Sequence, residues 1–179
     1  MSIVTKGGDS GETSLLYGGR VSKDDVRTEA YGALDEAISA MGLARSLCKN
    51  QEVAATLLEL ERECFTAGAE LATAAADRKK LLKHFPPLGA DAADRLEARV
   101  HELEERVGLP AGFVLPGGNP GAGAVGLSRS LVRRAERRAV GLMRAGELGN
   151  PEVLRYLNRL SDLLFMLARQ EEAGDTVLK

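Results

Sequence analysis

Residues 128–138 carry a run of arginines whose spacing could bind an anion. At about 100° per residue, Arg129, Arg133 and Glu136 fall on one stripe of a helix, at the border of its apolar face. Two guanidinium groups on such a border could meet an anion in a partly dry environment, and planar, permanently charged guanidinium suits phosphate and carboxylate. The alternative is a solvated helix face on which Glu136 pairs with Arg133 or Arg137.

A second candidate for anion binding is the glycine-rich segment 3–20. Its glycines can adopt positive φ, and consecutive backbone N–H groups in such a loop can form a concave anion site. Lys6 adds an ammonium group, and Thr5, Thr13 and Ser14 add hydroxyls. The segment is not a Walker A loop, because no Gly-Lys-Ser/Thr follows and no predicted strand precedes it. The alternative is a flexible N-terminus without a ligand.

Three further features could complete a site. Phe113 to Leu115 are apolar residues between turn formers, and they are either a plug over the end of the fold or a wall against a ligand. Asn158 and Asp162 are i, i+4 neighbours at the edge of an apolar helix face, where structural roles are equally open. Asp35 lies close to an apolar stripe, so it needs a cationic partner if it is buried and is otherwise a surface acid.

Helical periodicity predicts the elements that position these residues. We expect helices over about 25–48, 52–76, 91–107, 120–145 and 151–172, with loops over 77–89 and 108–118. Asp24 or Asp25 can cap the first helix, and Asn119-Pro120 and Asn150-Pro151 have N-cap and N1 chemistry. The expected inward-facing residues include Val26, Leu34, Met41, Leu47, Leu57, Phe65, Val132, Ala135, Met143 and Leu164. Short loops between five helices predict a single all-α domain, a five-helix up-and-down bundle.

Composition excludes several function classes. The chain has 179 residues, 28% of them charged, and a net charge of −2, which argues against a nucleic-acid partner. It has no apolar run of membrane-spanning length and no targeting segment, so we expect a cytoplasmic protein without a membrane partner. Cys48 and Cys64 fit reduced thiols. No HExxH or paired ExxH pattern occurs, so neither a zinc hydrolase nor a di-iron bundle is indicated.

Several separated stretches resemble the PduO-type ATP:cob(I)alamin adenosyltransferases. They are Thr5–Leu15, Gly19–Asp24, Glu29–Glu36, Phe113–Gly118, Arg129–Arg137 and Tyr156–Asp162. Their order and spacing follow the family pattern over nearly the whole chain. One departure is Gly126, where members often carry a larger, sometimes imidazole-bearing residue. This glycine and the glycine-rich segment 117–126 bear on the rigidity of the fourth helix and on the shape of the corrinoid pocket.

The resemblance implies a ferritin-like homotrimer with active sites between adjacent subunits. Residues 1–22 would form the ATP-binding loop of one subunit, and the arginine helix of the bundle, 23–179, would complete the site from its neighbour. The implied ATP contacts are Thr5, Lys6, Gly7, Gly8, Asp9, Gly11, Thr13, Ser14, Lys23, Arg129, Arg133, Glu136 and Asn158. The implied corrinoid contacts are Phe113, Val114, Leu115 and Asp162. Asp35 and Arg129 would pair across the subunit interface, and Mg²⁺ would be held mainly by the ATP phosphates.

The implied reaction transfers the 5′-deoxyadenosyl group of ATP to the cobalt of cob(I)alamin, obtained by reduction of cob(II)alamin. Cobalt carries the nucleophilicity, so no Ser, Cys or His nucleophile is required. The leaving tripolyphosphate is highly anionic and gives Lys6, Lys23, Arg129 and Arg133 a clear task. Glu136 would orient Arg133 or help hold the metal-triphosphate, and Phe113 would keep the lower axial position of cobalt free.

Partners implied by the resemblance are a flavin or other reductase and an adenosylcobalamin-dependent enzyme. Two alternatives from other classes remain open at this point. One is a non-catalytic chaperone that holds adenosylcobalamin for delivery, and the other is a nucleotide-sensing helical module without a corrinoid. An assay for adenosylcobalamin formation from ATP distinguishes an enzyme from the chaperone. A shift in the spectrum of cob(II)alamin on adding protein and ATP distinguishes a corrinoid-binding protein from the nucleotide-sensing module.

Overall fold

The computed structural model describes residues 3–172. Its helices are α1 Val26–Leu47, α2 Gln51–Leu71, α3 Arg78–Leu81, α4 Ala90–Val107, α5 Pro120–Arg144 and α6 Glu152–Glu171, with a 3₁₀ turn, η1, at Ala75–Asp77. Two short strands precede them, β1 Glu12–Ser14 and β2 Arg20–Ser22. The predicted bundle extends to residue 179, but residues 173–179 lie outside the described part of the chain.

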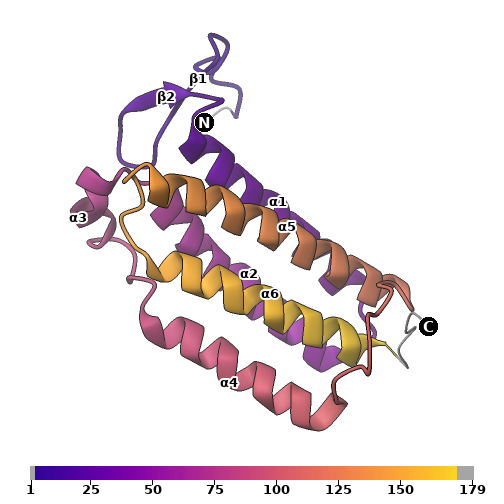
Figure 1. Ribbon diagram of the computed structural model, residues 1–179. Helices are drawn as coiled ribbons and strands as arrows, with labels where there is room; N and C mark the ends of the chain where they lie inside the picture. The colour runs from indigo at the N-terminus through magenta and orange to yellow at the C-terminus, as the bar shows by residue number, and fades with distance from the viewer. Residues whose placement is uncertain (1–2, 173–179) are drawn as a thin grey trace.

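The long helices α1, α2, α4, α5 and α6 run up and down in succession (Figure 1). α1 packs against α2 and α5, α5 packs against α6, and α4 packs on α6. The β1–β2 hairpin, the start of α1, the end of α2 and the α5–α6 connection lie at one end of the bundle. The connection between α4 and α5 lies at the other end. The predicted helical class is confirmed.

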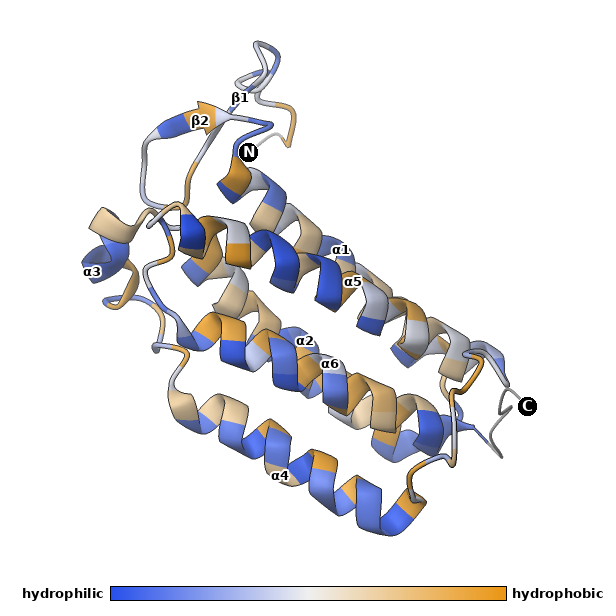
Figure 2. Ribbon diagram, viewed as in Figure 1, coloured by the Kyte–Doolittle hydropathy of each residue, from blue (hydrophilic) through white to orange (hydrophobic). Residues whose placement is uncertain are grey.

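Small apolar side chains fill the contact between α1 and α5. Ala30 and Ala37 of α1 and Ala135 and Ala139 of α5 are all fully buried. Because a methyl side chain adds little bulk, the two helix backbones can approach closely. Figure 2 shows that α4 is mostly hydrophilic, and its single buried strip consists of Ala92, Ala93, Leu96, Val100 and Leu103. This pattern places α4 at the outside of the bundle.

Four residues expected to face inward are exposed. Val26 and Leu47 are 52% and 42% exposed, and Met143 is 47% exposed. These three lie at or next to helix ends, where no neighbouring helix covers the apolar face. Phe65, in the middle of α2, is 66% exposed and borders an apolar groove instead. Periodicity alone does not tell whether the neighbouring helix reaches a given turn.

The predicted end of the second helix at residue 76 is wrong, because α2 ends at Leu71. The Arg27 guanidinium donates to the carbonyl oxygens of Leu71, the last residue of α2, at 3.0 Å and of Thr73, just beyond it, at 2.8 Å. The last carbonyls of a helix have no intrahelical partner, and Arg27 satisfies them from another helix. The predicted loop over 77–89 likewise contains η1 in part and α3.

The predicted N-cap at Asn119 is confirmed, whereas α6 begins one residue later than predicted, with Pro151 at its N-cap position. The side chain of Asn119 accepts a hydrogen bond from the backbone N–H of Ala122 at 2.9 Å. The side chain of Asn150 accepts from the N–H of Glu152 at 3.2 Å and donates to the carbonyl oxygen of Leu88 at 3.0 Å. Asn150 therefore ties the start of α6 to the segment before α4.

The N-terminal segment, expected to be a loop without strands, folds into an antiparallel hairpin. Thr13 pairs with Val21 at the centre of the register. The turn is made by Gly18 and Gly19, with φ of 98° and 78°, which favour glycine. Strands of three residues are too short to leave an alternating pattern in the sequence. None of the helices among the described residues is long and apolar enough to span a membrane.

Candidate active site

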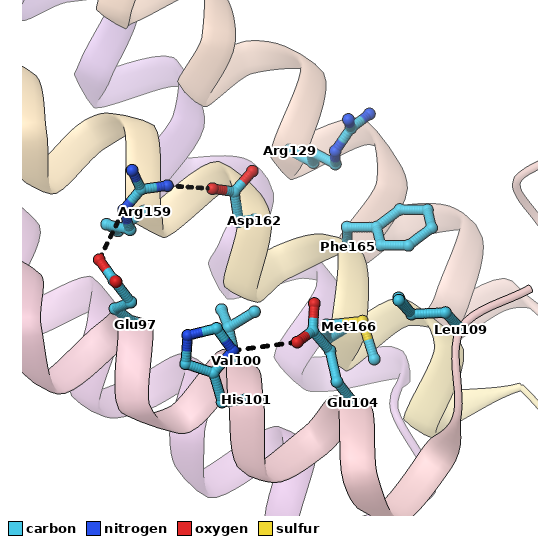
Figure 3. A pocket seen from close by; sticks show the side chains of 10 residues that line it. All are labelled: Glu97, Val100, His101, Glu104, Leu109, Arg129, Arg159, Asp162, Phe165 and Met166. Atoms are coloured by element: carbon cyan, nitrogen blue, oxygen red, sulfur yellow. Dashed lines mark hydrogen bonds and ion pairs between the residues drawn. The ribbon is translucent and has the colours of Figure 1, made fainter.

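A cavity of about 400 Å³ opens between α4, α5 and α6 (Figure 3). It is lined by Glu97, Val100, His101, Glu104, Leu109, Arg129, Arg159, Asp162, Phe165 and Met166. One wall is apolar and the others carry charges of both signs. Two of the predicted site residues, Arg129 and Asp162, are among the charged residues that line the cavity.

Arg129 is the cation that reaches the apolar part of the cavity. Its guanidinium carbon lies 5.5 Å from the centroid of the Phe165 ring, a cation–π distance. Its Nε is buried and has no hydrogen-bond partner among residues 3–172. Burial lowers the pKa of Arg129, the neighbouring charge of Arg133 lowers it further, and Asp162 opposes the shift. The charge therefore lacks a close counter-ion in the described chain.

Arg133 lies one helical turn further along α5 and is exposed. It has no ion-pair partner in the described part of the chain, so the predicted alternative of a Glu136 pair is not formed. Two other arginines of this helix differ: Arg134 pairs with Glu36, and Arg138 pairs with Glu29 of α1 at 3.2 Å, whereas Arg137 and Arg144, like Arg133, have no ion pair among the described residues. The helix thus neutralises one arginine stripe and leaves the other available to an anion.

Glu136 and Asn158 are neighbours across α5 and α6. The Asn158 carboxamide donates to Glu136 Oε1 at 3.2 Å. Asp162, one turn along α6 from Asn158, accepts from Arg159 Nη1 at 2.7 Å. The structure therefore brings Glu136 and Asn158 into contact across α5 and α6, and it places Asp162 in the same cavity as Arg129.

Residues to which sequence reasoning gave no role in the site also belong to this region. Arg159 bridges Asp162 and Glu97, to which its Nε lies 3.1 Å away. Phe165 lies under two guanidinium groups, since Arg169 is 5.7 Å from its ring centroid. In the sequence Phe165 is one more apolar residue on the α6 face, so no local signal distinguishes it from a core residue.

The loop carrying Phe113 is exposed at its apolar residues. Phe113 is 86% exposed and Leu115 is 47% exposed, whereas Val114 is half-buried. The end of the loop is held, because the Gly118 N–H donates to the carboxylate of Glu172 and the Asn119 side chain donates to the carbonyl oxygen of Glu171 at 2.8 Å. Phe113 therefore does not plug the bundle end in a single chain.

The glycine-rich start of α5 is a regular part of this helix. At Gly121 a Cβ atom would lie 3.0 Å from the Cα of Cys48, so the absent side chain permits close packing against the α1–α2 connection. At Gly126 a Cβ atom would lie 3.3 Å from the Cβ of Pro116. A larger residue at position 126 would press on the loop that carries Phe113.

The N-terminal loop is held in shape by its own residues. The Arg20 guanidinium donates to the carbonyl oxygen of Gly7 at 2.9 Å and to Glu12 at 3.1 Å. Lys6 adopts φ of 56°, and the ammonium of Lys23 lies beside Gly8, where a Cβ atom would approach it to 2.9 Å. Both ammonium groups lack ion-pair partners among the described residues. The remaining predicted ATP contacts of this segment, Thr5, Gly7, Asp9, Gly11, Thr13 and Ser14, lie in this loop and β1.

The structure does not bring the N-terminal loop and the Phe113 loop together in one chain, because they lie at opposite ends of the bundle (Figure 1). Asp35 is likewise separate from Arg129. It is exposed and borders a groove of about 430 Å³ between α1 and α2, with Leu16, Tyr31 and Phe65 among the lining residues. The expected Asp35–Arg129 pair is therefore not a contact within one chain.

The described residues contain no cluster of three or more His, Cys, Asp or Glu side chains that could hold a metal ion. The two thiols are free, and burial raises the pKa of Cys64 to about 12 and of Cys48 to about 11. Protonated thiols of this kind are poor nucleophiles. The site therefore offers cations and apolar surface.

Comparison with known proteins identifies the family of the chain. The sequence model of the cobalamin adenosyltransferase family matches residues 3–171. The chain is 38% identical over 175 residues to the corrinoid adenosyltransferase of Citrobacter freundii, covering 98% of this chain and 97% of that protein. It is 40% identical over 175 residues to the corrinoid adenosyltransferase of Bacillus subtilis strain 168, covering 94% and 86%.

Solved structures point the same way. A variant PduO-type ATP:corrinoid adenosyltransferase from Lactobacillus reuteri, complexed with cobalamin and ATP, has a TM-score of 0.90 and 34% identity, and the match covers 99% of both chains. Another variant of that protein, complexed with ATP, has a TM-score of 0.88 at 34% identity. With its unpaired arginine strip and glycine-rich N-terminal loop, this chain belongs to the cobalamin adenosyltransferase family.

Proposed function

We propose that the protein is a corrinoid adenosyltransferase, which transfers the 5′-deoxyadenosyl group of ATP to the cobalt of cob(I)alamin. The Co–C bond forms as the C5′–O bond breaks, and tripolyphosphate leaves with the bonding electron pair. The products are adenosylcobalamin and tripolyphosphate. Family membership and relatives that bear the name corrinoid adenosyltransferase support this reaction.

The observation that carries the proposal is the unneutralised charge of Arg129 and Arg133. Both guanidinium groups lack an ion-pair partner in the described chain, whereas Arg134 and Arg138 of the same helix are paired. Fixed cations beside an apolar wall stabilise negative charge that develops on a leaving group, because they need no reorganisation during the reaction. We assign Arg133 to the phosphate chain, with Asn158 and Glu136 setting the polar edge of the nucleotide site.

The active site is proposed to lie between subunits of a homotrimer of up-and-down bundles. The glycine-rich loop of one subunit, with Lys6 and Lys23, would face the arginine strip of its neighbour. Two observations support this arrangement. The glycine-rich loop and the Phe113 loop lie at opposite ends of one chain, and Asp35 lies exposed beside an apolar groove, while Arg129 lacks a close counter-ion. Asp35 of one subunit is proposed to pair with Arg129 of the next.

The corrinoid is proposed to bind against Phe113, Val114, Leu115 and Asp162. The exposed ring of Phe113 offers an apolar surface without a lone pair that could ligate cobalt. A ring below the corrin would exclude water and the lower base, which leaves Co(II) without a lower ligand and makes its reduction to Co(I) easier. A reductase and an adenosylcobalamin-dependent enzyme are the expected partners of such a reaction.

Magnesium is proposed to enter with the triphosphate. Mg²⁺ is commonly bound by one or two carboxylates together with substrate phosphates. Glu136 is the carboxylate on the arginine strip, and it is half-buried and held by Asn158. When bound, the ion would neutralise part of the phosphate charge, and the arginines would carry the rest.

The direct test measures adenosylcobalamin formation from ATP and cob(II)alamin under reducing conditions. The reaction is monitored by the loss of the Co(I) spectrum and by the release of tripolyphosphate. Turnover supports the enzyme. Tight binding of adenosylcobalamin without turnover would point to the chaperone, and an unchanged cob(II)alamin spectrum on adding protein and ATP would contradict both corrinoid functions.

A further inference from the structure

Arg27 is a buried arginine outside the arginine strip. It is the second residue of α1 and is 3% exposed. Its Nη1 donates to the carbonyl oxygens of Leu71 and Thr73, and its Nη2 donates to the backbone oxygen of Glu147 at 2.7 Å and to its carboxylate at 2.9 Å. One side chain thereby joins the start of α1, the end of α2 and the α5–α6 connection.

The two carbonyl groups that Arg27 holds flank Ala72. The carbonyl oxygen of Ala72 accepts a hydrogen bond from the N–H of Leu16, in the turn between β1 and β2, at 3.2 Å. A second contact lies nearby, where the Tyr17 ring stacks on His84 with centroids 5.9 Å apart and planes 16° from parallel. Both contacts dock the β1–β2 hairpin on the chain segment that follows α2.

The hairpin continues directly into the glycine-rich loop. The Lys23 N–H donates to the carbonyl oxygen of Gly11 at 2.9 Å, and Arg20 holds the carbonyl oxygen of Gly7. The loop therefore moves with the hairpin, and the hairpin is placed by residue 72. A displacement of the backbone of residues 71–73 would therefore shift the ammonium groups of Lys6 and Lys23.

We propose that Arg27 is a positioning residue for ATP, which fixes the end of α2 so that the hairpin presents the N-terminal loop to the triphosphate. This role rests on the proposed function of that loop. Arg27 itself is enclosed by protein and does not touch the nucleotide. Its Glu147 partner is 54% exposed at the side chain, so the buried carbonyl groups, rather than the ion pair, are the contacts that matter.

The expected effect on ATP binding depends on how much of the time the N-terminal loop is docked. If the loop spends only part of its time in the docked position, the apparent affinity for ATP falls by the fraction that is docked. Corrinoid binding at the Phe113 loop, at the other end of the bundle, is unaffected by this movement in the same subunit. A purely structural role would reduce the amount of folded, active enzyme, which lowers the apparent kcat and leaves the KM for ATP unchanged.

The experiment compares Arg27→Met, Arg27→Lys and a matched control, Tyr156→Phe. Tyr156 is fully buried and its hydroxyl donates to Glu63 at 3.1 Å, away from the hairpin. Amide exchange at residues 12–22 is measured without nucleotide, and KM is measured for ATP and for cob(I)alamin. Arg27→Met is expected to speed exchange and to raise the KM for ATP about tenfold with an unchanged corrinoid KM.

Arg27→Lys, which keeps the charge but has fewer donors, is expected to fall between Arg27→Met and the wild type, and it carries the test if Arg27→Met does not fold. Unchanged exchange in the hairpin, or an ATP KM that rises equally in Tyr156→Phe, would overturn the proposal. So would faster exchange with an unchanged ATP KM. In that last case Lys6→Ala decides the rest: a raised ATP KM leaves the loop assignment standing, and an unchanged one removes it as well.

Discussion

The guanidinium group of Arg129 lies 5.5 Å from the centroid of the Phe165 ring, on the side of α5 that faces α6. This contact holds a cation at an apolar wall without neutralising it. A carboxylate in the same position would satisfy the charge and close the site. The relationship explains how a half-buried arginine can remain available to a partner from outside its own chain.

The two arginine stripes of α5 provide a matched pair of variants. Arg133→Met is expected to lower kcat/KM for ATP by about a hundredfold or more, because it removes a cation from the leaving phosphate. Arg134→Met, one residue away, loses only the surface pair with Glu36 and is expected to change stability by less than about 1 kcal/mol with near-normal kinetics. Steady-state kinetics of both variants measure the difference. Equal losses of kcat/KM in the two variants would contradict the assignment of the phosphate contact to Arg133.

Asp35→Asn tests the proposed intersubunit pair. Leaving Arg129 without its partner in a dry interface is expected to cost about 3–5 kcal/mol, seen as dissociation of the trimer or as a large loss of activity. The neighbouring Glu36→Gln, which removes a surface pair, is the control. Analytical ultracentrifugation reports the assembly. A normal trimer with normal kinetics in Asp35→Asn would remove the pairing.

Phe113→Ala separates corrinoid activation from nucleotide binding. ATP affinity is expected to stay near the wild-type value, because the ring is not assigned to the triphosphate. Turnover from Co(II) is expected to fall more than about tenfold, equivalent to about 1.4 kcal/mol, and turnover from chemically prepared Co(I) much less. Parallel assays from the two cobalt states make the measurement. An equal fall in both, or weaker ATP binding, would make Phe113 a structural residue.

The buried thiol of Cys64 makes the stability of the folded chain fall at alkaline pH. Burial raises the pKa of this thiol from its ordinary value of 9.0 to about 12. Above pH 9 the unfolded thiol loses its proton while the folded one keeps it, so the folded state binds more protons and stability falls as pH rises. The loss is about 1.4 kcal/mol per pH unit for one group and is absent below the unfolded pKa.

Urea unfolding at pH 8 and pH 10 measures this slope, and Cys64→Ala isolates the thiol from the lysines and tyrosines that titrate in the same range. The alanine variant is less stable at pH 8 because a buried side chain becomes smaller. Its stability is expected to fall less between the two pH values than that of the wild type. Parallel slopes would mean that the thiol is solvated in the folded chain.

The sequence by itself determined the helical class and the approximate boundaries of most long helices, and it proposed the residues that could carry the chemistry. These depend on local signals: apolar side chains at helical spacing, Asn119 and Asn150 at helix starts, and glycines before the first helix. It also placed Arg129, Arg133 and Glu136 on one stripe, because helical geometry alone relates residues three and four apart. The resemblance of several short motifs then indicated the family.

Only the tertiary structure decided which of these charges remain unpaired. Arg134 is neutralised by a residue of α1, and Arg133 is not, although both stand in the same run of sequence. The partner of the last carbonyl of α2 is decided in the same way, because Arg27, 44 residues away in the chain, donates to it. Contacts of this kind join segments distant in sequence, and their free energy comes from packing and buried hydrogen bonds that no local pattern encodes.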